Sequence, residues 1–402
     1  MSCQETIKLG LLHEEDAVNL FLHHATENGK DCPNKLKLLA SKVVIECGNL
    51  PVVIVAVART FRNWDPNEWE DAFAVIEKDS SLRHGNIDEE VKKFYNSLKI
   101  SFKCLDRGAQ DLILLCSIFS RAYEIPVEVL SRIAIGSRLS ENVGSYYRAR
   151  SEVLSIKTTL IRSALLLTTR EGFVKMHDVI RDIAHQIGDE KIQVITDSKS
   201  KLKENVKYSS WMIDDFSNSF EGINLEVLLV WVNNASHPLG VPEAFFGGMK
   251  GLRVLLLCSK VKFRRTLALS LPKSIHSLEN IQTLSLTNWE LGDISILQNL
   301  KKLQTLELTN CSISELPNEV SQQEKLRLLG LVDCSIEKNN CWLDSSCSNV
   351  VYFSSGTTSV WFFSSCCPLV GSFLLTSIEG GDRVILREGG DLYPISNPKN
   401  QR

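Results

Sequence analysis

The sequence lacks paired cysteines and a targeting signal, two features that often identify the class of a protein directly. Its 12 cysteines stand singly, apart from the neighbours Cys366 and Cys367, so they lack the paired spacing of zinc ligands and we expect no metal site. The absence of a disulfide framework favours a reducing, cytoplasmic location. The opening stretch MSCQETIKLGLLHEED has no cationic region leading into an apolar run, which disfavours a secretory signal or transit peptide.

An excess of one charge sign is also missing. The 402 residues hold 45 Lys and Arg against 48 Asp and Glu, a formal net charge of -3 that provides no basic field for nucleic acid. We therefore expect no direct nucleic-acid partner. The uncharged stretch 345–378 is rich in Ser and contains Pro, Gly and Thr, so it is too polar for us to expect a membrane span. The chain length predicts more than one domain.

Helical spacing dominates the first half of the chain. A helix is predicted between Asn34, a candidate cap, and Gly48, a candidate stop. The next stretch, PVVIVAVART, is compatible with a buried strand or an all-round apolar helix, and its helical surroundings favour the helix. Asp65, Pro66 and Glu68 then form the signature of a capping box with proline at the first helical position.

Beyond residue 220 the pattern changes to a repeat of the form L-x-x-L-x-L. The five copies start at Leu225, Leu252, Ile281, Leu303 and Leu326, at intervals of 27, 29, 22 and 23 residues. These intervals are typical of leucine-rich repeats, in which each unit supplies a short strand to a solenoid. We expect the following leucines to point inward: Leu255, Leu257, Leu284, Leu286, Leu306, Leu308, Leu329 and Leu331. Alternate residues should face outward: Arg253, Gln304, Glu307 and Arg327.

The last two repeats complete the leucine-rich pattern with a cysteine after the strand. Cys311 and Cys334 stand where that pattern has asparagine or cysteine. After residue 344 the repeat is lost, and we interpret residues 345–402 as an atypical, disordered tail.

A histidine–aspartate pair precedes one strongly amphipathic helix. His177 and Asp178 stand before an apolar stripe formed by Ile180, Ile183, Ala184 and Ile187. Local reasoning alone favours a capping role for the pair.

Four stretches, in this order before the repeats, resemble plant intracellular immune receptors of the coiled-coil class. These disease resistance proteins carry an NB-ARC nucleotide switch followed by leucine-rich repeats. The stretches are LLHEEDAVNLF, ECGNLPVVIVAVA, LLCSIFSRAYEI and KMHDVIRDIA, and the resemblance covers about residues 10–340. It implies an α-helical NB-ARC remnant, helical domain plus winged helix, followed by an α/β leucine-rich-repeat solenoid. The implied domains are 1–80 (helical domain), 81–195 (winged helix) and 205–344 (repeats).

The resemblance also implies two cofactor-binding residues. His177 would face the β-phosphate of ADP, and Pro51 would pack near the adenine. The implied cofactor is ADP or ATP. The implied partner is a pathogen effector or a guarded host protein, bound through the repeats in plant defence.

The phosphate-binding loop of such a switch is absent from the sequence. No G-x-x-x-x-G-K-[ST] motif occurs, since Lys30 after Gly29 is followed by Asp31 and His24 stands where the first glycine belongs. We therefore expect an N-terminally truncated receptor that is not an enzyme and does not hold ADP or ATP tightly.

Three alternatives remain. An AAA-like hydrolase is disfavoured because the phosphate-binding lysine is missing. A nucleic-acid-binding winged helix is disfavoured because DVIRDIAHQIGDE is not basic. A truncated, non-functional or decoy interaction fragment stays open.

Overall fold

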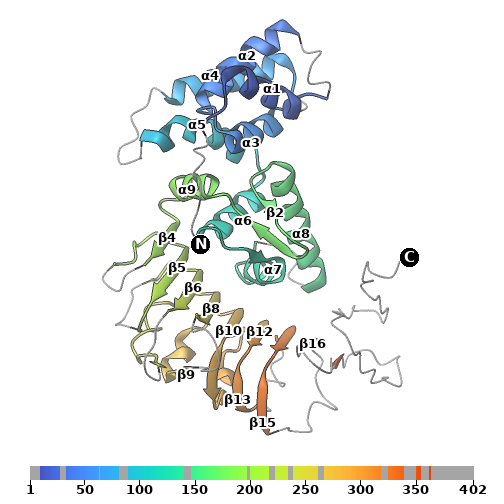
Figure 1. Ribbon diagram of the computed structural model, residues 1–402. Coiled ribbons are helices and arrows are strands. Elements are labelled where there is room, and N and C mark those ends of the chain that lie inside the picture. Colours follow the sequence, from blue (N-terminus) through green and yellow to red (C-terminus); the bar gives the residue numbers. More distant parts are fainter. Residues whose placement is uncertain are drawn as a thin grey trace, which may run out of the picture. The chain divides into compact units, whose positions relative to one another are not determined.

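A computed structural model describes two compact units of the chain. The described residues are 10–27, 33–62, 64–80, 89–139, 146–196, 200–216, 222–233, 239–260, 267–317, 325–338, 350–354 and 362–363. The first unit comprises Met1–Leu130 and Glu152–Asp189, and the second comprises Ser131–Ser151 and Glu190–Arg402 (Figure 1).

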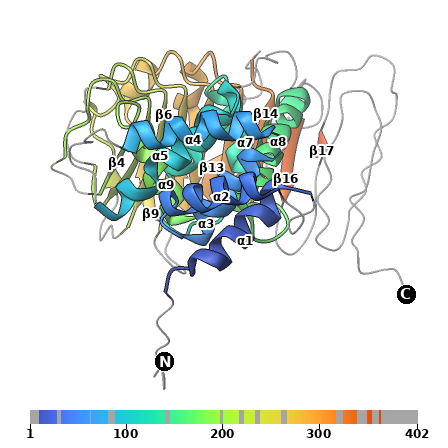
Figure 2. The ribbon, with the colours of Figure 1, turned by 90° about the horizontal axis from the view of Figure 1, so that it is seen from above.

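The first unit begins with helices that pack against one another (Figure 2) and enclose an aromatic core. The helices are α1 (Glu14–Ala25), α2 (Asn34–Glu46), α3 (Pro51–Phe61), α4 (Pro66–Ser80) and α5 (Glu89–Lys103). Phe21, Phe61 and Trp69 meet edge to face, with ring centroids 5.5–5.7 Å apart. The PVVIVAVART stretch is helical as predicted, because α3 is packed between α1 and α5 and buries most of its surface.

The capping box before α4 is confirmed. The backbone N–H of Asp65 donates to Glu68 Oε2 at 2.6 Å, and Asp65 Oδ1 accepts from the N–H of Glu68 at 3.0 Å. The prediction that Asn34 caps α2 was wrong: Asn34 is already helical, and Pro33 takes the capping position without a side-chain hydrogen bond. Gly48 follows α2 with φ 60°, a conformation that suits a helix end.

The remainder of the first unit joins three helices to a small sheet. The helices are α6 (Arg107–Ser117), the greater part of α8 (Tyr146–Arg162) and α9 (Asp178–Ile187). The strands β1 (Ile125–Pro126), β3 (Phe173–Lys175) and β2 (Leu167–Thr168) are antiparallel, in that order. Helix α5 packs against α2, α3 and α4 and also against α9, so the segments predicted as 1–80 and 81–195 share an interior. Helix α7 (Val127–Gly136) begins in this unit and ends in the second.

The second unit is built on a ladder of parallel strands, one for each repeat (Figure 1). Its nine-stranded sheet is parallel from β4 to β16, and β17 pairs antiparallel with β16. The strands are β4 (Ile192–Ile195), β5 (Tyr208–Ile213), β6 (Val227–Val232), β8 (Val254–Ser259), β10 (Thr283–Thr287), β12 (Thr305–Thr309), β14 (Leu328–Val332), β16 (Val350–Ser354) and β17 (Phe362–Phe363).

A second parallel sheet runs through the return segments of the same repeats. It contains β7 (Leu239–Gly240), β9 (Leu267–Ser270), β11 (Trp289–Gly292), β13 (Ser312–Glu315) and β15 (Ser335–Lys338). The 3-10 turns η1 (Lys273–Ser277) and η2 (Ser295–Asn299) complete two of the returns. A strand and a return in each repeat make this unit a solenoid.

The inward leucines are confirmed. All eight predicted leucines are at most 2% exposed and belong to one core, and each lies beside its equivalent one repeat away, as Leu284 does beside Leu306. After the strands, Asn288, Asn310 and Asp333 have positive φ values of 64°, 49° and 52°. Cys311 Sγ then donates to Leu286 O at 3.3 Å and Cys334 Sγ to Leu308 O at 3.2 Å, so these thiols satisfy carbonyls inside the solenoid.

The ladder reaches past the predicted repeat range on both sides. Strand β4 precedes residue 205, and β16 follows residue 344. The sequence of β16, VVYFS, is rich in β-branched and aromatic residues, which favour strands. The remainder of the predicted tail, 345–402, lies outside the described residues apart from β17. In the described part of the chain, no helix combines the length and apolar character needed to cross a membrane.

Candidate functional site

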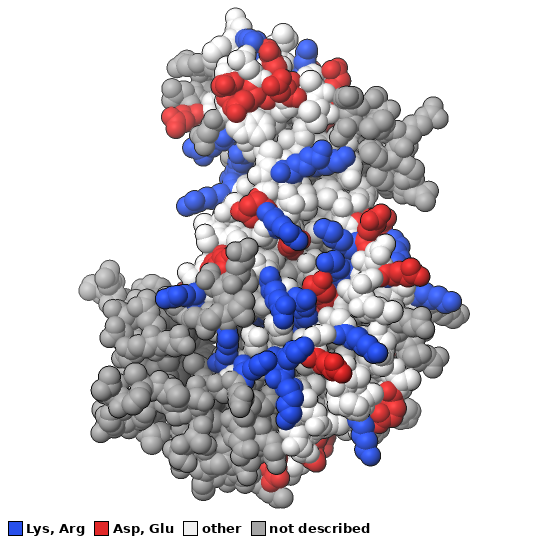
Figure 3. All heavy atoms as spheres, turned by 180° about the vertical axis from the view of Figure 1, so that it is seen from behind, with Lys and Arg blue, Asp and Glu red and all other residues white. Residues whose placement is uncertain are grey.

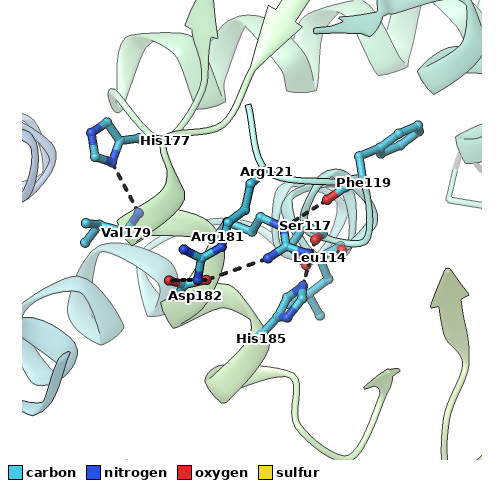
Figure 4. A network of polar contacts seen from close by, with 9 residues as sticks. All are labelled: Leu114, Ser117, Phe119, Arg121, His177, Val179, Arg181, Asp182 and His185. Carbon is cyan, nitrogen blue, oxygen red and sulfur yellow. Dashed lines mark hydrogen bonds and ion pairs between the residues drawn. The ribbon is translucent and has the colours of Figure 1, made fainter. Parts of the chain in front are cut away.

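His177 occupies the N-cap of α9 and is exposed (Figure 4). Its Nδ1 accepts a hydrogen bond from the backbone N–H of Val179 at 3.2 Å. A ring nitrogen that accepts carries no proton, so in the neutral ring the proton is on Nε2. The capping interpretation and the phosphate interpretation are therefore compatible, because one nitrogen caps the helix while the other can donate.

The start of α9 has a mixed electrostatic character. Helix N-termini favour anions, and Asp178 supplies a carboxylate in the first turn. Oδ1 of Asp178 is buried and makes no hydrogen bond with the described residues. A ligand phosphate near His177 would thus be attracted by the N-terminus of the helix and repelled by the carboxylate of Asp178.

Two side chains of α9 bind the end of α6 (Figure 4). Arg181 Nε donates to the carbonyl oxygen of Phe119 at 2.9 Å, and His185 Nε2 lies 2.7 Å from the carbonyl oxygen of Ser117. Carbonyls at a helix C-terminus lack intrahelical partners, so these contacts satisfy groups that burial would otherwise leave unpaired. Helix α9 is thereby fixed to the predicted LLCSIFSRAYEI motif.

An acidic side chain extends this network. Arg121 Nη2 contacts both carboxylate oxygens of Asp182, at 3.1 and 2.9 Å. Arg181 Nη1 lies 3.6 Å from Asp182 Oδ1, so one carboxylate serves two guanidinium groups. Arg181 is 9% exposed, and Asp182 offsets part of the cost of burying its charge.

Burial sets the protonation of His185. Desolvation lowers the pKa of His185, and the nearby guanidinium of Arg181 lowers it further. At neutral pH the ring is uncharged, and the contact with Ser117 O requires its proton on Nε2. This network was missed by the sequence reasoning, which used only the apolar stripe. The sequence did contain one indication of this network: Arg181 and His185 are four residues apart and therefore lie on the same face of a helix.

Pro51 is the first residue of α3 and is exposed. The preceding Leu50 is extended, as is usual before proline, and the helix starts without a side-chain cap. The turn before it is joined to the first motif, because the N–H of Leu12 donates to Asn49 O at 3.3 Å. No hydrogen bond among the described residues joins Pro51 to His177. The link between them is α5, which packs against both α3 and α9.

The prediction that Glu307 faces outward from the repeats was wrong. It was expected to face outward, yet it is buried in the second unit, where it pairs with Arg132 of α7. Ser285 Oγ donates to Glu307 Oε2 at 3.3 Å, and Thr283 Oγ1 donates to Arg132 O at 3.3 Å. A Cβ at Gly136 would collide with the side chain of Thr283, so the backbone approaches the strands closely there.

Five leucine repeats in register on a parallel ladder define a leucine-rich-repeat protein with an additional helical unit. No family model matches the chain. A probable disease resistance protein of Arabidopsis thaliana, At4g27220, is 29% identical over 308 residues, which cover 72% of this chain and 32% of that protein. The disease resistance protein UNI, also of Arabidopsis thaliana, is 28% identical over 349 residues, 82% of this chain and 38% of that protein.

The chain is therefore similar in sequence to plant disease resistance proteins. It spans about a third of the length of the curated relatives that it matches. Among solved structures, internalin C2 of Listeria monocytogenes aligns with 59% of this chain and 100% of its own, at 14% identity and a TM-score of 0.27.

Proposed function

We propose that the chain is part of a plant immune receptor. Its second unit recognises a protein, a pathogen effector or a guarded host protein, and its first unit relays that event as part of an NB-ARC switch. The observation that carries this proposal is the match to disease resistance proteins over most of the chain, including both units. A solenoid supports the recognition role because its stacked strands offer a long surface to a partner.

The motif contacts support the switch role of the first unit. Leu12 and Asn49 join the first two motifs, and Arg181 and Phe119 join the last two. We assign α1 to α4 to the helical domain, and α6, α8, α9 and the sheet β1-β3-β2 to a winged helix. A three-stranded antiparallel sheet packed with helices is consistent with that assignment.

The residues present fit one contact to a nucleotide rather than a complete site. Nε2 of His177 is suited to donate to a phosphate oxygen, and Pro51 offers an exposed apolar ring. The 402 residues hold no phosphate-binding loop motif. We propose that ADP or ATP binds only when another segment supplies that loop, and that this chain alone hydrolyses no ATP. A cytoplasmic location fits the unpaired, buried thiols of Cys47 and Cys116.

Disruption of the gene in the plant that carries it tests the immune role. Mutant and wild-type plants are inoculated with a panel of pathogen isolates, and pathogen growth is measured. We expect increased growth of at least one isolate and restoration by the wild-type gene. Unchanged growth of every isolate would count against the receptor proposal.

A further inference from the structure

Cys311 and Cys334 occupy equivalent positions in two adjacent repeats of the second unit. The residues two positions before them are paired in the parallel register of β12 and β14, and the residues just after them in that of β13 and β15. Asn310 N–H donates to Val332 O at 2.7 Å, and Ser335 N–H donates to Cys311 O at 2.9 Å. Backbone hydrogen bonds on both sides thus hold the two cysteines beside each other.

The two sulfurs lie in equivalent surroundings. Cys311 Sγ is 3.3 Å from Leu286 O, and Cys334 Sγ is 3.2 Å from Leu308 O, one repeat further on. Neighbouring parallel strands are about 4.8 Å apart, within the range of about 4.4–6.8 Å between Cα atoms that a disulfide joins. The two thiols are also close enough to form a hydrogen bond with each other. A disulfide between them therefore requires little movement of the backbone.

The two thiols differ in acidity and in access. A hydrogen bond with Cys311 lowers the pKa of Cys334, whereas the interaction with Cys334 and then burial raise the pKa of Cys311. Cys334 is half-buried, and Cys311 is 2% exposed. Because the thiolate is the form that reacts with oxidants, Cys334 reacts first, and Cys311 is the neighbouring thiol that reacts with the product.

The other cysteines that the structure describes lack this combination. Burial raises the pKa of Cys47 to about 12 and that of Cys258 to about 11, and it also raises the pKa of Cys116. Cys104 is exposed, yet partial burial of its thiol raises its pKa as well. Among the described cysteines, Cys334 alone has both access to solvent and a lowered pKa.

We propose that Cys311 and Cys334 form a reversible disulfide when the chain meets a peroxide. The Cys334 thiolate attacks one oxygen of hydrogen peroxide, the O–O bond breaks, and hydroxide leaves and takes up the proton that Cys334 lost. The product is a sulfenic acid at Cys334. The Cys311 sulfur then attacks the Cys334 sulfur, its proton passes to the departing hydroxyl group, and water leaves. In total the two thiols lose two electrons and two protons, and one peroxide becomes two water molecules.

Selectivity for this pair comes from the thiols rather than from surface charge. Hydrogen peroxide is neutral, so the basic and acidic side chains of the surface, drawn for one face in Figure 3, do not steer it. The adjacent Cys311 thiol captures the sulfenic acid at Cys334 before a second peroxide oxidises it irreversibly. The pair therefore stops at the reversible stage.

The bridge would join one repeat of the solenoid to the next. It links the ends of β12 and β14, so it restricts the local openings in which these strands separate. Cβ atoms joined by a disulfide are about 3.5–4.5 Å apart, less than the strand spacing, so the bridge is strained and readily reduced by a small thiol. Oxidation thus stiffens this part of the solenoid reversibly. The inference is independent of the proposed function.

Peptide mapping of the full chain tests the bridge. The folded, reduced protein is treated with a small molar excess of hydrogen peroxide, free thiols are alkylated, and the protein is digested without reduction. Trypsin cleaves between the two cysteines, at Lys325 and Arg327, and again at Lys338. We expect a linked pair of peptides containing Cys311 and Cys334 that separates after treatment with dithiothreitol. Hydrogen exchange of the β14 amides should become about tenfold slower or more on oxidation.

Single substitutions by serine, which keeps a donor for the carbonyls, separate the two roles. In Cys311→Ser, dimedone should trap a sulfenic acid at Cys334. In Cys334→Ser, the labelling of Cys311 should be at least about tenfold weaker. The control Cys104→Ser, at an exposed cysteine, should form as much bridge as wild type.

Three results would count against the proposal. The first is a Cys334 that stays reduced in the folded, peroxide-treated protein or is joined to a different cysteine. The second is a bridge to Cys311 that forms only in urea, since the folded geometry would then not support it. The third is equal exchange of the β14 amides in the reduced and bridged proteins, which would contradict the stiffening.

Discussion

Arg181 and Phe119 are joined by a hydrogen bond across 62 residues, from the guanidinium Nε of α9 to a carbonyl oxygen just beyond α6, at 2.9 Å. Arg181 is buried together with this bond. The position of α9 is therefore fixed by a charged side chain as well as by the apolar stripe of Ile180 and Ile183. Because His177 begins the same helix, this contact also determines where its ring lies.

Replacing Arg181 by methionine should loosen α9. The change leaves the carbonyl of Phe119 buried without its donor, a loss of about 1.5–3 kcal/mol for a hydrogen bond to a charged group. Hydrogen exchange of the α9 amides, followed by mass spectrometry, should become faster by about tenfold or more. The matched change Arg62→Met, at an exposed arginine, should leave the exchange of α9 unaltered. Equal exchange in both variants would show that the apolar stripe alone holds the helix.

Ile183 tests the contribution of that stripe. Its side chain is 2% exposed, so Ile183→Ala should lower the free energy of unfolding by about 2–5 kcal/mol. Ile45→Ala is the control, because Ile45 is 57% exposed on α2 and its truncation should cost less than about 0.5 kcal/mol. Urea denaturation measures both. A negligible loss at Ile183 would mean that the interior has been assigned wrongly.

The repeats could be predicted from sequence more fully than the network around α9. The leucines recur in a pattern that alternates along each strand, and neighbouring repeats enforce one register, so Leu284 and Leu306 were assigned correctly. Arg181, His185 and Phe119 meet through contacts between distant segments. Periodicity within one helix does not report which carbonyls its polar side chains reach.

Glu307 in the repeats is a second residue whose contacts with a distant segment could not be predicted from a local sequence pattern. Alternation correctly placed it on the face opposite the leucine core. Its burial depends on Arg132, 175 residues earlier, and no local pattern links the two. Likewise Asn34 has the right residue type for a cap, but Pro33 already occupies that position.

Arg132 and Glu307 should contribute jointly, not independently, to the free energy of unfolding of the second unit. Each is less than 10% exposed, so Arg132→Met alone or Glu307→Leu alone removes the opposite charge from a buried ion pair and should cost about 3–5 kcal/mol. The double variant removes both charges and should cost much less than the sum of the single changes. Urea denaturation of the four proteins gives the coupling. Additive losses would show that the two charges act independently.

His185 should make stability depend on pH. Its pKa in the folded chain is lowered, by burial first and by Arg181 next, so the unfolded chain takes up a proton at a higher pH than the folded chain. Stability is complete above the unfolded pKa of about 6.5, falls as the pH drops through that value, and levels off below the folded pKa. Arg121 also lowers the pKa, whereas Asp182 and the carbonyl of Ser117 raise it.

The variant His185→Gln isolates this dependence. A glutamine amide keeps a donor for the carbonyl of Ser117 and does not titrate. Between about pH 7 and pH 5, wild type should lose more stability than the variant, as measured by urea denaturation at each pH. Parallel pH profiles in the two proteins would exclude His185 as the source.

The two ring nitrogens of His177 allow the capping role and the phosphate role to be separated. Nδ1 caps α9 through Val179, and Nε2 is the proposed donor to the β-phosphate of ADP. Asparagine is a strong N-cap residue but is too short to reach as far as Nε2, whereas alanine removes both functions. In the 402-residue chain, His177→Ala should cost about 0.5–2 kcal/mol of stability and His177→Asn close to none.

ADP binding is then measured in a longer chain, in which a domain with a phosphate-binding loop precedes Met1. Wild type should bind ADP, and both His177→Ala and His177→Asn should weaken binding by about tenfold to a hundredfold, because a charge-assisted hydrogen bond contributes about 1.5–3 kcal/mol. Isothermal titration calorimetry gives the affinities. Asparagine thus restores the cap without restoring the ligand contact. Equal ADP affinity for wild type and His177→Asn would leave the histidine with the helix cap as its only role.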